Sequence, residues 1–217
     1  MKRLSSKARV EAFTLIEVLV VIVIVFVLGA MLLPRLAGSH KSVLVACLNN
    51  LKQIDLGFSL YASDSRGEYP MQVSVTRGGT MEFIYSDHVF PHFQKLSRYL
   101  PQPQTLVCPL DKSRQAATSY EALNDLNISY FLNADASTNN PATTILVGDR
   151  SLQANGQTVK AGLFILTTNS NLSWTPDLHL GRGCLAFADG HVQSYLSKSL
   201  NAIVQQQPLA TNRLVVP

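Results

Sequence analysis

The sequence predicts an α+β fold in which a long N-terminal helix packs on a small antiparallel β-sheet. Three observations lead to this prediction. An almost uninterrupted apolar run lies near the N-terminus, and a stripe of apolar residues at helical spacing follows it. Short β-rich runs, separated by turn residues, then occupy the second half of the chain. These features divide the chain into residues 1–12, 13–34, 35–62 and 63–217.

The first segment, residues 1–12, is polar and basic, and we interpret it as a cytoplasmic leader peptide. It carries four Lys and Arg side chains against one acidic side chain, so it supplies most of the net charge of +4. Positive charge ahead of an apolar span keeps the N-terminus in the cytoplasm and sends the rest of the chain outside. Because the positive charge is local to this leader, we expect no nucleic acid as a partner.

The second segment, residues 13–34, is predicted to be a transmembrane helix. Between Phe13 and Leu33 the only polar side chains are Thr14 and Glu17. A hydrocarbon core of roughly 30 Å needs about 20 helical residues to cross it, which this run supplies. A secretory signal peptide is an alternative, although its apolar region spans only about 7–15 residues. A plain single-span anchor is the other alternative.

The third segment, residues 35–62, is predicted to continue the same helix. Apolar residues recur there every three or four positions, which places them on one face of a helix that packs on the globular domain. We expect Pro34 to kink the helix, because proline removes one backbone hydrogen bond. The stripe consists of Leu44, Leu48, Leu51, Ile54, Phe58 and Tyr61.

The fourth segment, residues 63–217, has the composition of a globular domain outside the cytoplasm. Asp189-Gly190 separates two β-rich runs and favours a hairpin turn, because both residue types tolerate positive φ. A short helix is expected within residues 92–100, before Pro101. The strand-like runs are Thr143–Val147, Leu163–Thr168, Cys184–Ala188 and Val192–Leu196.

The run Ala-Phe-Thr-Leu-Ile-Glu, from Ala12 to Glu17, resembles the cleavage and methylation site of type IV prepilins and type II secretion pseudopilins. The resemblance implies a pilin-like fold, cleavage between Ala12 and Phe13 by a prepilin peptidase, and N-methylation of Phe13. The residue before the cut is usually Gly, and Ala12 is the nearest to it in size. The resemblance also implies assembly with copies of itself or other pilin-like subunits, on an inner-membrane assembly platform.

Glu17 is expected to guide this assembly. A carboxylate in a spanning helix costs about 2.5–3.5 kcal/mol at the membrane centre, so it normally has a partner. Cleavage after Ala12 would place the new amine of Phe13 about one helical turn from Glu17. We expect Glu17 of one subunit to pair with the amine of its neighbour and to set the axial register. In the alternative, the carboxylate stays at the membrane interface, solvated or protonated.

His179 is followed, after nine intervening residues, by Asp189 and Gly190. This spacing resembles the H-X9-DG signature of a large group of pilin-like proteins from planctomycete and verrucomicrobial bacteria. The Asp-Gly pair most simply forms a turn, and His179 is expected to hydrogen-bond that turn or the start of the hairpin. A cation site that uses Asp189 with His179 or His191 stays open, since major pseudopilins bind calcium near the C-terminus.

The three cysteines, Cys47, Cys108 and Cys184, all follow the apolar run and would lie in a compartment that permits disulfides. An odd number leaves at least one cysteine free or paired between chains. A disulfide between Cys47 and Cys108 would tether a loop of about 60 residues to the helix. Buried free thiols are the alternative for this pair. Cys184 lies in a strand-like run and is expected in the core.

The sequence therefore predicts a structural subunit of a type IV pilus or of a type II secretion-like pseudopilus. It spans the inner membrane once, in contact with lipid, with the C-terminal domain in the periplasm. No nucleophile elbow, Walker loop or HExxH motif occurs, so we expect neither enzymatic activity nor a cofactor. The alternative is an anchored module that binds a polysaccharide or another extracellular ligand. Exposed aromatic residues around Trp174 would favour that alternative.

Overall fold

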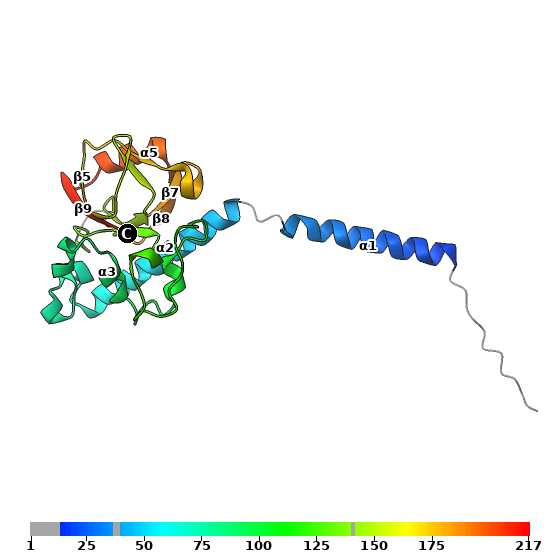
Figure 1. Ribbon diagram of the computed structural model, residues 1–217, viewed down its shortest axis with the longest axis horizontal. Helices are drawn as coiled ribbons and strands as arrows, with labels where there is room; N and C mark the ends of the chain where they lie inside the picture. The colour runs from blue at the N-terminus through cyan, green and yellow to red at the C-terminus, as the bar shows by residue number, and fades with distance from the viewer. Residues whose placement is uncertain (1–13, 37–39, 140–141) are drawn as a thin grey trace, which may run out of the picture. The chain divides into compact units, whose positions relative to one another are not determined.

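The computed structural model describes residues 14–36, 40–139 and 142–217, and it describes side chains in these ranges except at residues 30–42 (Figure 1). The chain forms two compact units, Met1–Ser39 and His40–Pro217. Ala12 and Phe13, at the predicted cleavage site, lie outside the described residues.

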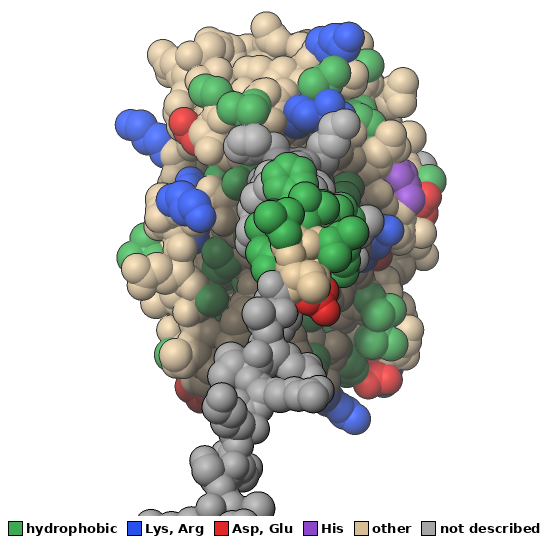
Figure 2. Space-filling model, turned by 90° about the vertical axis from the view of Figure 1, so that its right-hand side faces the viewer, with side chains coloured by type: hydrophobic (Ala, Val, Ile, Leu, Met, Phe, Trp, Pro, Cys, Tyr) green, Lys and Arg blue, Asp and Glu red, His purple; other side chains and the backbone are tan. Residues whose placement is uncertain are grey.

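The first unit contains helix α1 (Leu15–Leu36). From Leu15 to Leu28 its apolar side chains are exposed, with Phe26 at 76 %, and in Figure 2 hydrophobic side chains surround the helix. Measured by length and apolar content, none of the helices in the described part of the chain meets the requirement for crossing a membrane. The sequence predicts one continuous helix through this region. The structure describes two helices, since α1 ends at Leu36 and the next helix begins at His40.

The second unit begins with helix α2 (His40–Asp64), which packs against strands of the main sheet. Leu51, Ile54 and Phe58 are fully buried, and the rest of the predicted stripe packs against the same core. The stripe therefore faces the domain, as its helical spacing predicts.

The main sheet has six strands in the order β5-β9-β1-β2-β7-β8, and every neighbouring pair is antiparallel. The predicted strand-like runs correspond to β2, β5, β7 and β8. The strands are β1 (Tyr130–Asn133), β2 (Ile145–Asp149), β5 (Gly162–Thr167), β7 (Arg182–Phe187), β8 (Val192–Leu196) and β9 (Thr211–Val216). A second, three-stranded sheet contains β3 (Leu152–Ala154), β4 (Gln157–Thr158) and β6 (Leu172–Trp174).

The two faces of the main sheet bury different helices. On β7, Cys184 and Ala186 pack in the core that includes α2, whereas Leu185 and Phe187 pack in the core that includes α5 (Ser197–Gln205). This alternation is the period of two that a strand imposes on its side chains. The domain is therefore layered, with α2 on one face of the sheet and α5 and β6 on the other. Together with the N-terminal helix, this is the α+β pilin-like fold that the sequence predicts.

Short helices occupy the connections. The helix predicted within residues 92–100 lies slightly earlier, because α3 spans Phe90–Gln94 and turns follow it. The others are η1 (Pro70–Gln72), η2 (Val75–Arg77), η3 (Met81–Tyr85), η4 (Pro103–Leu106), η5 (Asp125–Asn127) and α4 (Pro176–His179).

Candidate functional site

Glu17 is the only predicted processing or assembly residue that the structure describes, and it lies in the first turn of α1. Its carboxylate accepts hydrogen bonds at 2.8 Å from both the backbone N–H and the hydroxyl of Thr14. The Glu17 N–H in turn donates to the Thr14 hydroxyl oxygen at 3.4 Å. This reciprocal arrangement is a capping box, which satisfies N–H groups that a helix start leaves unpaired. The cap holds the exposed carboxylate at the N-terminal end of the helix.

Cys47 and Cys108 form a disulfide in the interior of the second unit. Their Cα atoms are 5.4 Å apart, and both residues are fully buried. The bond joins α2 to the segment after η4, where Asn50 also donates to the Val107 carbonyl at 3.0 Å. The third cysteine, Cys184, is a buried free thiol on β7.

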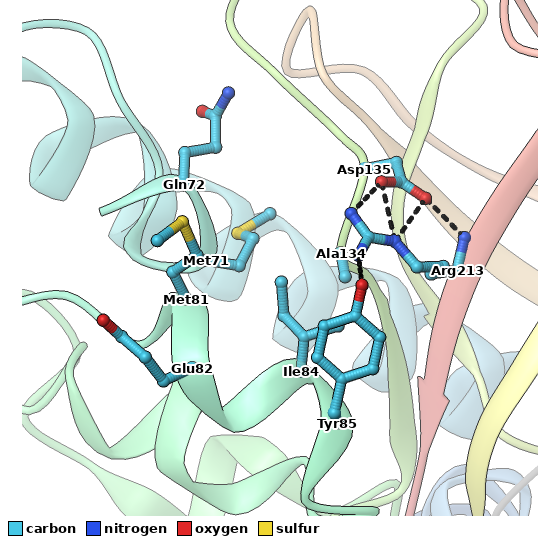
Figure 3. Close-up of a pocket in the computed structure, with 9 residues that line it drawn as sticks. All are labelled: Met71, Gln72, Met81, Glu82, Ile84, Tyr85, Ala134, Asp135 and Arg213. Atoms are coloured by element: carbon cyan, nitrogen blue, oxygen red, sulfur yellow. Dashed lines mark hydrogen bonds and ion pairs between the residues drawn. The ribbon is translucent and has the colours of Figure 1, made fainter. Parts of the chain in front are cut away.

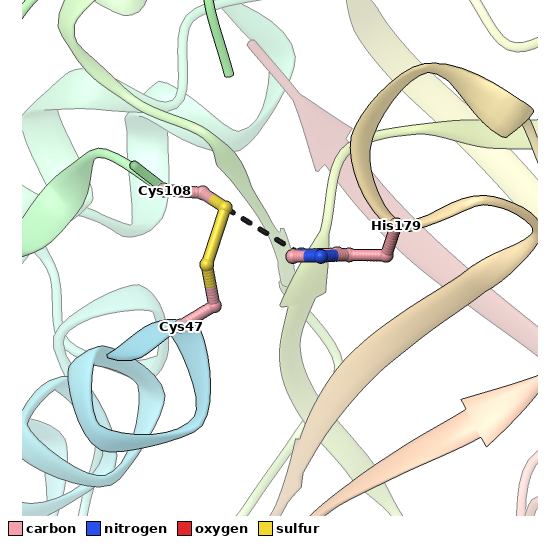
Figure 4. Close-up of side chains that lie close together, drawn as sticks. All are labelled: Cys47, Cys108 and His179. Atoms are coloured by element: carbon pink, nitrogen blue, oxygen red, sulfur yellow. Dashed lines mark hydrogen bonds between the residues drawn. A yellow bond between two sulfur atoms is a disulfide. The ribbon is translucent and has the colours of Figure 1, made fainter. Parts of the chain in front are cut away.

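His179, at the end of α4, lies against this disulfide (Figure 4). Its Nε2 atom is 3.5 Å from Cys108 Sγ and 3.4 Å from Asp149 Oδ2. The predicted hydrogen bond from His179 to the Asp189–Gly190 turn or to the start of the hairpin is therefore wrong, because Nδ1 has no partner and Nε2 contacts Cys108 and Asp149. The ring lies beside Cys184 in the middle of β7, and the rest of that strand separates it from the turn.

Asp149, at the end of β2, connects His179 to β7. Its Oδ2 atom accepts a hydrogen bond of 2.7 Å from the Cys184 backbone N–H, while Oδ1 is buried without a hydrogen-bond partner. Burial, with the negative charge of Asp149 beside it, raises the pKa of the Cys184 thiol. Sequence reasoning missed Asp149, because the contact depends on the pairing of β2 with β7 across more than thirty residues of chain.

Asp189 and Gly190 form the predicted turn between β7 and β8. Gly190 has φ of +92°, a conformation that glycine adopts without a Cβ penalty. Asp189 Oδ1 accepts from the His191 backbone N–H at 3.2 Å and contacts the His191 ring nitrogen at 2.5 Å. The described donor groups that could hold a metal include His179, but neither Asp189 nor His191.

Asp55 of α2 faces this turn and was not singled out by the sequence. A Cβ atom on Gly190 would lie 3.6 Å from Asp55 Oδ2. Asp55 is only 6 % exposed, and its Oδ1 atom has no hydrogen-bond partner. Burial first, and then the nearby charge of Asp189, raise the pKa of Asp55 to about 6. An acidic residue directly after Ile54 of the buried stripe was the signal available in the sequence.

Trp174 is not a surface platform. It is 3 % exposed and packs in the core beneath β6. A Cβ atom on Gly183 would come within 2.4 Å of the indole ring, so this strand position has room only for glycine. The tryptophan therefore fills the interface between the two sheets.

A surface hollow of about 650 Å³ lies elsewhere on the domain (Figure 3). Met71, Met81 and Ile84 supply apolar surface to it. At one side the Arg213 guanidinium binds the Asp135 carboxylate and donates to the Tyr85 hydroxyl at 2.6 Å. Tyr85 is 69 % exposed. The lining comes from four separate stretches of chain, so no local pattern in the sequence predicts it.

A prokaryotic N-terminal methylation motif matches residues 7–33. No curated protein and no solved structure matches the chain significantly. The likeness of His179–Gly190 to the H-X9-DG signature therefore remains a resemblance. The motif implies processing by a prepilin peptidase and assembly with other pilin subunits. The chain is thus a protein with a prepilin-type N-terminal methylation motif and an α+β pilin-like fold.

Proposed function

We propose that this protein is a structural, non-enzymatic subunit of a pilus or pseudopilus, assembled after cleavage between Ala12 and Phe13 and methylation of Phe13. The observation that carries the proposal is the methylation motif at residues 7–33, which includes most of α1. The described side chains of α1 are almost all apolar and exposed. A helix that is apolar on every side needs lipid or other protein around it.

The proposed topology places α1 in the inner membrane before assembly, with the N-terminus in the cytoplasm and the domain in the periplasm. The basic leader supports this orientation. The Cys47–Cys108 disulfide supports the location of the domain, because disulfides persist in oxidising compartments and are rare in the cytosol.

In the proposed assembly mechanism, Glu17 is the register-setting residue. The Thr14 cap holds its carboxylate at the start of α1, close in sequence to the amine that cleavage would create on Phe13. The carboxylate of one subunit pairs with the amine of its neighbour, and the apolar faces of α1 then stack laterally. Between the two filament types, we assign the subunit to a type II secretion-like pseudopilus, on the resemblance of residues 179–190 to the H-X9-DG group.

Mass spectrometry of the mature N-terminus tests the processing step. The expected species begins with N-methylated Phe13. An intact Met1, or a cut after residue 33, would overturn the proposal.

The assembly step is tested with Glu17→Ala and a matched control, Glu121→Ala, which removes an exposed carboxylate from the domain. Both variants should be cleaved, but only Glu17→Ala should remain in the membrane fraction while the control enters filaments as the wild type does. Sheared-filament preparations and immunoblots measure this partition. Normal incorporation of Glu17→Ala would exclude the register role of Glu17.

The hollow beside Tyr85 supports a second candidate function, an anchored module that binds an extracellular polysaccharide. One face of the Tyr85 ring carries the Arg213 guanidinium, 5.5 Å from the ring centre, and the residue remains largely exposed. An exposed aromatic ring beside polar side chains suits a sugar. Co-sedimentation with insoluble polysaccharides, compared between wild type and Tyr85→Ala, tests it; equal sedimentation would reject it.

A further inference from the structure

Three metal-ligand side chains meet in the interior of the domain, away from the N-terminal motif. They are Asp149 at the end of β2, His179 at the end of α4 and the free thiol Cys184 on β7. One donor atom from each lies within 4.8 Å of the other two. All three residues are buried, with His179 at 6 % exposure and the others at 0 %.

The Asp149 carboxylate has one oxygen atom that no group of the protein binds. This atom, Oδ1, is buried without a hydrogen-bond partner. Buried polar atoms in native proteins nearly always have partners, so each exception calls for an explanation such as an ion. Leaving such an atom unsatisfied destabilises the folded state, and the cost is larger for a charged group.

The spacing suits a tetrahedral ion. Zinc lies about 2.0–2.2 Å from nitrogen and oxygen ligands, so two such ligands on a tetrahedral zinc are separated by roughly 3.4 Å. His179 Nε2 and Asp149 Oδ2 are 3.4 Å apart. The Cys184 backbone N–H fixes this carboxylate at 2.7 Å. The three residues would supply three of the four ligands of a tetrahedral ion, and a water would supply the fourth.

We propose that Asp149, His179 and Cys184 form a buried zinc-binding site. The mixed sulfur, nitrogen and oxygen donor set favours zinc over calcium or magnesium, which prefer oxygen ligands. Binding takes the neutral imidazole of His179 and releases the thiol proton of Cys184 to solvent. No electron is transferred.

The site would join β2, α4 and β7, which are separate in sequence, next to the Cys47–Cys108 disulfide. His179 already lies against Cys108, so the ion would fix the imidazole that packs on the disulfide. The proposal is independent of filament assembly, because none of these residues belongs to the N-terminal motif.

The test uses cobalt(II) as a spectroscopic probe for zinc. The full chain, with its disulfide intact, is unfolded in denaturant with EDTA and refolded in detergent with cobalt(II), because the buried site must load during folding. We expect about one cobalt ion per chain, thiolate-to-cobalt charge transfer and the intense d–d bands of tetrahedral cobalt. Added zinc should displace the cobalt and bleach the bands.

Cys184→Ala should abolish the charge-transfer band and weaken binding at least tenfold. The matched control is His92→Gln, since His92 is also a buried histidine but its ring bonds Thr80. This control should bind cobalt as the wild type does. A natively folded wild type without cobalt bands, or equal binding by wild type and Cys184→Ala, would overturn the proposal. Circular dichroism establishes the fold of each sample.

Discussion

Helices α1 and α2 have similar lengths, 22 and 25 residues, but they differ in whether their apolar side chains are buried. In α2 the stripe that includes Phe58 is buried against the sheet of the same chain. In α1 Phe26 and its apolar neighbours are exposed throughout the part that the structure describes. The difference indicates that α2 holds the domain together, whereas we propose that α1 offers its apolar surface to lipid or to other subunits.

The acidic residues Glu17 of α1 and Asp55 of α2 also differ in burial. Glu17 is exposed and held by the Thr14 cap, so its carboxylate can still accept another partner. Asp55 is buried beside the Gly190 turn, where its carboxylate is sealed into the domain. The acid on α1 is therefore the one that we propose for contacts with other molecules, whereas the acid on α2 affects the stability of the domain.

The largest expected effect separates the two helices directly. Phe58→Ala removes a fully buried ring and should lower the free energy of unfolding by about 3–5 kcal/mol. Phe26→Ala removes a ring that is 76 % exposed and should change it by less than about 0.5 kcal/mol. Urea unfolding of both full-length variants in detergent measures the contrast. Equal losses would contradict the division between the helices.

Loss of the Cys47–Cys108 disulfide, which joins α2 to the segment after η4, should have the next largest effect on stability. Cys47→Ser opens a disulfide that spans 61 positions, and the loop-closure entropy predicts a loss of up to about 4 kcal/mol. The thermal midpoint of the variant should match that of wild type in reductant. If reductant leaves the wild-type midpoint unchanged, the bond does not stabilise the attachment of α2.

The smallest expected effect concerns the buried acid of α2. The pKa of Asp55 in the folded state is about 6, above its ordinary value of 3.8. Ionisation of Asp55 therefore lowers the free energy of unfolding. The reduction is complete above pH 6 and disappears as the pH falls toward 4. Asp55→Asn should be more stable by about 3 kcal/mol at pH 7.5 and equal to wild type near pH 4. Urea unfolding at the two pH values checks the prediction, and a pH-independent difference would refute it.

Local patterns in the sequence predicted the parts of this protein that local physics determines. The spacing of the apolar stripe predicted which face of α2 is buried, and Asp189-Gly190 predicted the β7–β8 hairpin. Strands β1 and β9 were missed, because the short Tyr130–Asn133 run and Thr211–Val216 become strands by pairing with distant partners. Strand order depends on such long-range pairing, which a single sequence does not display.

The same distinction applies to the candidate sites. The methylation motif is contiguous, so the resemblance of residues 12–17 to prepilin cleavage sites was enough to identify it, and the matched motif covers residues 7–33. The neighbours of His179 come from β2, β7 and the disulfide, and no local pattern joins them. Sequence reasoning therefore found His179 but placed it at the wrong partner.

The position of the disulfide also has a mechanical consequence. Cys47 is the first buried residue among the described side chains of α2, so it lies where tension from the N-terminal side of the chain enters the domain. A pulling force on the anchor passes at that point into a covalent cross-link to Cys108. The cross-link would therefore keep the part of α2 after Cys47 from separating from the sheet one turn at a time. A subunit under tension would keep its domain folded.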